Sequence, residues 1–226
     1  MRRRSQIFLL LTILVITFIV GIASTLLESQ KTQYTDPLQQ VPNITSAWEG
    51  TISDIQESLI LTLAQRSDGS IANTSVAMDN AIDGFFFKIV NFLQLKGYSA
   101  SITLENTIVD GLDYLHHSNG ASPSKTTEAF ELSNIEVNVA IQSSTASLSQ
   151  KIFFDIYYES IVNSGSQTVT LYKIINGVRT GLTNAEFSTP GATITETFGG
   201  QYSYVGTGTH NVRVLDGILF SSLVLA

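Results

Sequence analysis

Three histidines and nearby carboxylates are the residues of this chain best suited to bind a metal ion. His116 and His117 lie close to Asp110 and Asp113, whereas His210 lies far along the chain. Imidazole nitrogens and carboxylate oxygens are common metal ligands. Adjacent residues on a helix point about 100° apart, however, so His116 and His117 would not reach one ion together as an i, i+4 pair does. The pattern indicates a solvated helix end and predicts no metal site.

Asp79 and Asp83 are the second candidate, because two acids one helical turn apart place their carboxylates on one face. The same spacing is typical of the wet side of an amphipathic helix, and we favour that interpretation. The sequence contains no glycine-rich phosphate loop, nucleophile elbow or zinc-protease helix motif. It also contains no cysteine, which excludes disulfides, thiolate metal sites and cysteine nucleophiles. We therefore expect a protein that is not an enzyme and has no cofactor.

Two acceptor patterns for N-linked glycosylation lie in segments that we expect to be exposed. Asn43 begins the pattern Asn-Ile-Thr, and Asn73 begins the pattern Asn-Thr-Ser. Both fall on the side of the membrane where such modification would occur, given the orientation argued below. Asn43 and Asn73 are therefore candidate glycosylation sites.

Aromatic residues of the C-terminal half offer another possible contact with sugars, because planar rings can stack on pyranoses. The set considered is Phe153, Tyr157, Tyr202 and Tyr204. The preference of aromatic residues for strands explains the same positions without any ligand. A sugar-binding face is thus one hypothesis, and ordinary sheet packing is the other.

The N-terminus carries the strongest signal for localisation. Residues 7–27 read IFLLLTILVITFIVGIASTLL and contain no charge. At about 1.5 Å per residue, such a helix spans roughly 30 Å, the thickness of a bilayer core. Arg2, Arg3 and Arg4 precede it, whereas residues 28–36 contain one lysine and two acids. The basic flank predicts a single-pass membrane protein with a cytoplasmic N-terminus and an extracellular C-terminal region.

Three fates of this helix remain open. It can stay as an uncleaved signal anchor, or it can be a signal peptide cut after Ala23. The third follows from residues 2–8, Arg-Arg-Arg-Ser-Gln-Ile-Phe, which resemble the start of an archaeal type IV pilin-like precursor. The resemblance implies cleavage between Ser5 and Gln6, after which the helix packs into a filament. Leu10 differs from the family, many of whose members have a glutamate there.

The remaining chain divides into a polar linker, a helical region and a strand-rich region. Pro37 and Pro42 predict an extended stalk. Apolar spacing predicts a helix from near Ser53 to a break at residues 67–69, a second over 76–95 and a third over 104–117. The expected parts are a basic leader (1–6), a transmembrane helix (7–27), a stalk (28–46), a helical region (47–118) and a β-sandwich (128–226).

From about residue 130 the apolar period changes from helical to two, as in half-buried strands. Strands are expected near 135–141, 152–158, 168–175, 193–198, 202–205, 211–215 and 218–225. Asn176-Gly177 predicts a tight hairpin turn. The last run is apolar on both faces, which predicts a strand in the interior of a sheet.

The turn placement of this region resembles the immunoglobulin-like modules of archaeal surface proteins. The residues that carry the resemblance are Val162-Asn163-Ser164-Gly165, Leu171-Tyr172-Lys173, Asn176-Gly177 and Thr189-Pro190-Gly191. It covers residues 130–226 and implies an antiparallel immunoglobulin-like sandwich. The expected fold class is therefore α+β.

Charge narrows the range of partners. Arg2 to Arg4 account for three of the 12 basic residues, which leaves nine against 19 acidic residues in the rest of the chain. A phosphate backbone would be repelled, so we expect no nucleic-acid partner. The sequence favours an anchored extracellular structural or adhesive protein that contacts membrane lipid through residues 7–27 and engages surface proteins or glycans. A pilin-like filament subunit is the alternative, and an anchored ligand sensor or enzyme is a weaker one.

Overall fold

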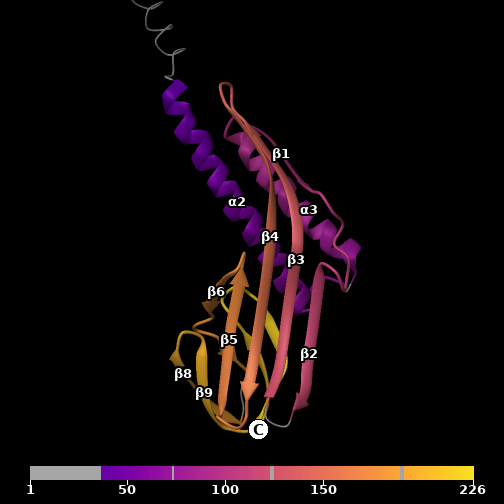
Figure 1. Cartoon of the computed structure of the whole chain (residues 1–226), viewed down its shortest axis with the longest axis vertical. Coiled ribbons are helices and arrows are strands. Elements are labelled where there is room, and N and C mark those ends of the chain that lie inside the picture. The colour runs from indigo at the N-terminus through magenta and orange to yellow at the C-terminus, as the bar shows by residue number, and fades with distance from the viewer. Residues whose placement is uncertain (1–36, 73, 123–124, 189–190) are drawn as a thin grey trace, which may run out of the picture. The chain divides into compact units, whose positions relative to one another are not determined.

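The computed structural model describes residues 37–72, 74–122, 125–188 and 191–226. Over these residues the chain is α+β, with two helices and antiparallel strands in a sandwich-like arrangement (Figure 1). Contacts divide the chain into residues 1–46 and 47–226, and the packing described below lies within the second part.

The first helix, α2 (Pro37–Ser67), starts earlier than the sequence indicated. Proline is well suited to the first position of a helix, because no intrahelical acceptor is available there for a backbone N–H. The expected extended stalk is therefore wrong for residues 37–46, and the expected start near Ser53 lies inside the helix. The break after Ser67 is confirmed, since Gly69 adopts a positive φ of 78°.

The buried stripe of α2 combines apolar and hydroxyl side chains. Ile55, Leu59 and Leu63 are fully buried, as the apolar spacing predicts. Ser58 and Thr62 are buried on the same helix, and each hydroxyl donates to the carbonyl four residues earlier. Because those bonds satisfy the hydroxyl groups, this face can turn inward without unpaired donors.

The second helix, α3 (Ser75–Leu95), confirms the prediction for residues 76–95. The Thr74 side chain caps its N-terminus by accepting from Ala77 N. Gly97, at φ 88°, allows the chain to leave the helix in the left-handed region. Ile82, Phe86 and Leu93 are buried, and α3 packs along strand β1 (Ser99–Leu104).

The third expected helix, over residues 104–117, is wrong. Residues 105–113 form a loop, and strand β2 (Tyr114–Ser122) follows. Although Leu112 and Leu115 match a helical spacing, they are 74% and 43% exposed, so these apolar residues share no buried face. Pairing with a distant strand, β3, decides the structure of this segment.

The large sheet is built on a long hairpin of β3 (Lys125–Gln142) and β4 (Ser147–Asn163). Its order is β1-β3-β4-β5-β9-β8, with β2 beside β3 and β6 beside β5. One end of β3 pairs with β2 and the other end with β1. The remaining strands are β5 (Thr168–Ile175), β6 (Val178–Gly181), β8 (Ala192–Phe198) and β9 (Gln201–Gly206).

A smaller sheet forms the second layer, in the order β11-β10-β7. Its strands are β7 (Glu186–Phe187), β10 (Gly208–Arg213) and β11 (Leu219–Leu225). Strand β11 lies against β3 and β4 of the large sheet, so Phe220 and Leu223 enter the core between the layers. The expectation that the last strand is interior to a sheet is wrong, because β11 is the end strand of the described three-stranded sheet.

The hairpin between β5 and β6 confirms the Asn176-Gly177 turn. Both residues have positive φ, 49° and 81°, as a tight turn between twisted strands requires. This turn fixes the register of β6, so that Arg179 lies opposite Ile174 of β5.

Candidate functional site

The histidines and acids of the expected metal candidate are not brought together. His116 lies on β2, where its Nε2 is 3.2 Å from Glu128 Oε1 and its ring stacks on Phe130 at 4.4 Å. Asp113 instead accepts from Val109 N, and His210 is buried on β10 against the Ser188 carbonyl oxygen. Within the described ranges, no three His, Asp or Glu side chains are grouped so that they could hold a metal ion.

Glu128 is a polar group that sequence reasoning missed. Its side chain is only 2% exposed, and its Oε1 faces His116 and accepts a 3.2 Å hydrogen bond from Ser221 Oγ. These contacts join β2 and β3 of one layer to β11 of the other. Nothing in the alternation of β3 distinguishes Glu128 from an outward-facing acid, so the sequence held no signal for it.

Asp79 and Asp83 do not act as a carboxylate pair. Asp79 Oδ1 accepts a hydrogen bond of 3.0 Å from Ile108 N and thereby ties the loop before β2 to α3. Burial raises the pKa of Asp79, the hydrogen bond from Ile108 lowers it, and the charge of Asp83 raises it. The interpretation that these acids lie on the solvent-exposed face of the helix holds for Asp83, but not for the partly buried Asp79.

The modification sites fall mostly outside the described residues. Ser5, Gln6 and Asn73 are among these, as is the apolar segment 7–27. Asn43 is exposed on α2. In the part of the chain that the structure describes, neither helix combines the length and apolar character needed to cross a bilayer.

The four aromatic residues considered for sugar binding do not share one face. Tyr202 and Tyr204 are 3% and 1% exposed and point into the core. The Tyr202 hydroxyl donates to the Leu182 carbonyl oxygen at 2.8 Å. Phe153 and Tyr157 instead lie on the outward side of β4, opposite the buried residues of the same strand. The hypothesis of a four-residue face is therefore wrong. Tyr157 instead belongs to another group of residues on the outward side of the large sheet.

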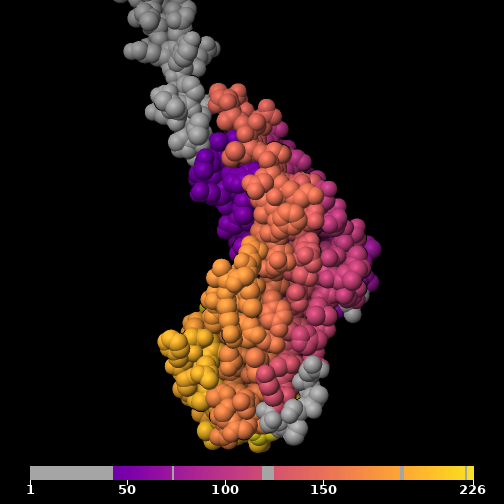
Figure 2. Space-filling model, viewed as in Figure 1, coloured from indigo at the N-terminus to yellow at the C-terminus, as the bar shows by residue number. Residues whose placement is uncertain are grey.

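This set, the aromatic face, consists of Glu131, Tyr157, Glu159, Tyr172 and Arg179. Strand pairing places these residues in two neighbouring rows across the sheet. One row contains Glu131, Tyr157, Ile174 and Arg179, and the next contains Glu159 and Tyr172. Directly opposed residues on neighbouring strands share a face of the sheet. Figure 2 shows this side of β3, β4 and β5 uncovered by other elements.

The aromatic face combines two neighbouring tyrosine rings with charged side chains. The rings of Tyr157 and Tyr172 lie 6.2 Å apart, and the guanidinium carbon of Arg179 lies 4.0 Å from the centre of the Tyr172 ring. The Tyr172 hydroxyl donates to Glu159 Oε2. Burial raises the pKa of Tyr157, and so do a hydrogen bond with Glu159 and the charges of Glu159 and Glu131. Tyr157 therefore stays neutral near pH 7 and keeps its hydroxyl proton.

Aromatic rings, carboxylate acceptors and guanidinium donors together suit a neutral ligand rich in hydroxyl groups. The rings offer apolar stacking surface with a polar edge. Glu131 and Glu159 offer oxygens that accept hydrogen bonds, and Arg179 offers several N–H donors. Together these groups could hold such a ligand by ring stacking and hydrogen bonds.

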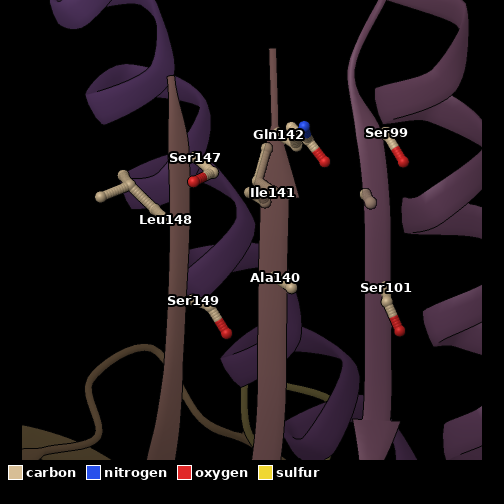
Figure 3. A pocket seen from close by; sticks show the side chains of 9 residues that line it. Ser99, Ser101, Ala140, Ile141, Gln142, Ser147, Leu148 and Ser149 are labelled. Atoms are coloured by element: carbon tan, nitrogen blue, oxygen red, sulfur yellow. The ribbon is translucent and has the colours of Figure 1, made fainter. Parts of the chain in front are cut away.

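Two shallow hollows flank strand β1. One, of about 290 Å³, is lined by short side chains that include Ser101, Ala140 and Ser149 (Figure 3). The other, of about 310 Å³, lies between α3 and β1 and includes Asp83 and Phe87. The first offers hydroxyl groups without a titratable side chain, and the second offers one acid beside apolar groups. Neither hollow contains as many kinds of polar group as the aromatic face does.

No protein-family model, curated protein or solved structure matches this chain.

Proposed function

We propose that this chain is a structural or adhesive protein of the cell surface that binds glycans through the aromatic face. Residues 7–27 would anchor it in the membrane, with the N-terminus cytoplasmic and the α+β part outside. The two sheets would form an immunoglobulin-like sandwich, a proposal supported by their antiparallel pairing and by the Asn176-Gly177 hairpin.

The observation that carries the glycan proposal is the Tyr157–Tyr172 pair with its carboxylate and guanidinium neighbours. Two rings on an open sheet face can stack against a sugar ring, and Glu159 holds at least the Tyr172 hydroxyl in a fixed direction. Of the five residues, Glu131 and Glu159 can accept hydrogen bonds from sugar hydroxyl groups, and Arg179 can donate to them.

Replacing Tyr157 with alanine tests the proposal. Loss of one stacking ring is expected to weaken glycan binding about tenfold, which corresponds to about 1.4 kcal/mol. The measurement is a glycan array with the detergent-solubilised full chain, followed by titration of the best glycan against wild type and Tyr157→Ala.

Phe198→Ala is the matched control, because Phe198 is an exposed aromatic residue (84%) on β8, outside the aromatic face. This variant should bind as wild type does. Absence of binding to every glycan, or equal loss in both variants, would count decisively against a glycan-binding aromatic face.

A filament subunit is the second candidate, and α2 favours it. Its 31 residues form a helix about 46 Å long that starts ten residues after the apolar segment. A long helix close to the N-terminal apolar segment is what the resemblance to type IV pilin-like precursors implies. N-terminal sequencing of the mature protein decides between the two: Gln6 as the first residue supports a processed subunit, and Met1 or Arg2 supports an anchor.

A further inference from the structure

A lysine on the core-facing side of the large sheet meets an aspartate from the smaller sheet. Lys173 of β5 stands directly opposite Tyr158 of β4, so both side chains lie on the face that packs between the layers. Asp216 lies in the turn between β10 and β11. Lys173 Nζ contacts Asp216 Oδ2, and the two side chains are only 22% and 26% exposed. We propose that Lys173 and Asp216 become joined by an intramolecular isopeptide bond.

The lysine of this pair is less exposed than the lysine or arginine of the other such ion pairs among the described residues. Lys151, which contacts Glu136 and Glu105, is 41% exposed. Arg213, which lies 3.9 Å from Asp68, is 45% exposed. Moving an amine and a carboxylate out of water costs free energy that their attraction does not always offset. A neutral amide in place of the Lys173–Asp216 pair removes both charges and therefore that cost.

Tyr158 supplies a third group at the same carboxylate. Its side chain is fully buried, and its hydroxyl donates a 2.7 Å hydrogen bond to Asp216 Oδ2. Burial raises the pKa of Tyr158, and the contact with Asp216 raises it further, so the hydroxyl remains a donor. The donor can polarise the Cγ–Oδ2 bond and so assist the departure of Oδ2 as water.

The reaction needs no added reagent. The Lys173 ammonium transfers a proton to Asp216 Oδ2, and the resulting amine attacks the carboxyl carbon Cγ. The Nζ–Cγ bond forms and the Cγ–Oδ2 bond breaks. Oδ2 leaves with two of the three ammonium protons as water, and the amide nitrogen keeps the third. No oxidation or reduction occurs, and the chain loses the mass of one water molecule.

Such a bond would add a covalent link between the two layers. The two residues are 43 positions apart, so the amide closes a loop that includes β6 to β10. A cross-link restricts the unfolded chain and so favours the folded state. The chain has no cysteine, and an amide would give it a covalent tie that does not depend on redox conditions. This inference does not rest on glycan binding.

Peptide mapping of the full chain tests the proposal. After denaturation, trypsin should fail to cleave at Lys173 and should release residues 152–179 joined to residues 214–226. This product should weigh one water less than the sum of the two peptides, and fragmentation should place the branch at Lys173 and Asp216. Free peptides 152–173 and 214–226 as the products from wild type would overturn the proposal. Loss of water confined to peptide 214–226 would also overturn it, because a succinimide at Asp216-Gly217 gives that mass without a link.

Two variants sharpen the result. Lys173→Arg keeps the positive charge and the trypsin site but removes the nucleophilic amine, so the linked product should be absent. Tyr158→Phe keeps the ring and removes the donor, so the linked fraction should fall several-fold. A linked product that persists in Lys173→Arg would contradict the assignment of the nitrogen, and an unchanged fraction in Tyr158→Phe would contradict the role of the hydroxyl.

Discussion

Asp79 accepts a hydrogen bond from an amide 29 residues away and so holds the loop before β2 against α3. Its carboxylate does this while partly buried, which raises its pKa from the ordinary 3.8. The folded state therefore binds the Asp79 proton more tightly than the unfolded state does. The contribution of this group to stability is greatest below the unfolded pKa and falls as pH rises through the higher folded pKa.

Asp79→Asn is expected to retain the acceptor oxygen and to abolish this pH dependence. Relative to the variant, wild type should lose stability as pH rises from about 4 to 7, so that Asp79→Asn is at least as stable as wild type at pH 7. Asp79→Ala also removes the acceptor and should cost about 1 kcal/mol. Thermal unfolding at several pH values measures both. The account of Asp79 would be wrong if the asparagine variant were as unstable as the alanine variant at pH 7.

At the scale of elements, strand β6 passes unusually close to the turn between β8 and β9. A Cβ built on Gly181 would lie 1.8 Å from the Gly199 carbonyl oxygen, and one built on Gly200 would lie 2.4 Å from the Leu171 carbonyl oxygen. Both contacts are with backbone, which cannot rotate away. Glycine at these positions is therefore required by the approach of the strands.

Gly181→Ala is expected to destabilise the fold by about 1–3 kcal/mol, because the added methyl group forces β6 away from that turn. The matched control is Gly165→Ala, where the nearest atom to the added Cβ is the Asn163 side-chain oxygen at 3.5 Å. Denaturant unfolding of the full chain in detergent measures the difference. Equal stability of the two variants would show that the close approach does not exist.

The sequence predicted elements whose signals are local and missed those that depend on distant pairing. Residues 168–175 form β5 with the expected bounds, because alternation and the Asn176-Gly177 turn are both local signals. The helical spacing of four leucine or isoleucine residues predicts a helix over 104–117, whereas β2 in this segment pairs with β3, which lies further along the chain.

The sequence predicts only part of the candidate site, because local signals place a strand but not its register with distant strands. The sequence predicts Tyr157 as an aromatic residue on the strand expected near 152–158. Tyr172 and Arg179 join it through the registers of β4 with β5 and β5 with β6. The hairpin turn alone could have placed Arg179 opposite Ile174, but the register of β4 with β5 has no such local signal.

At the scale of the whole molecule, we propose display at a cell surface because residues 7–27 are uncharged and apolar and follow Arg2 to Arg4. Beyond Arg2 to Arg4 the chain is acidic, and it contains no cysteine. The absence of cysteine gives a direct test of orientation, because any thiol introduced by mutation is the only one in the chain.

The central claim, that the α+β part lies outside a membrane crossed by residues 7–27, is tested most directly by labelling Ser144→Cys on intact cells. Ser144 is exposed, between β3 and β4. A membrane-impermeant maleimide should label this cysteine without lysis, and the cysteine-free wild type gives the background. Labelling that appears only after the cells are lysed would contradict the claim.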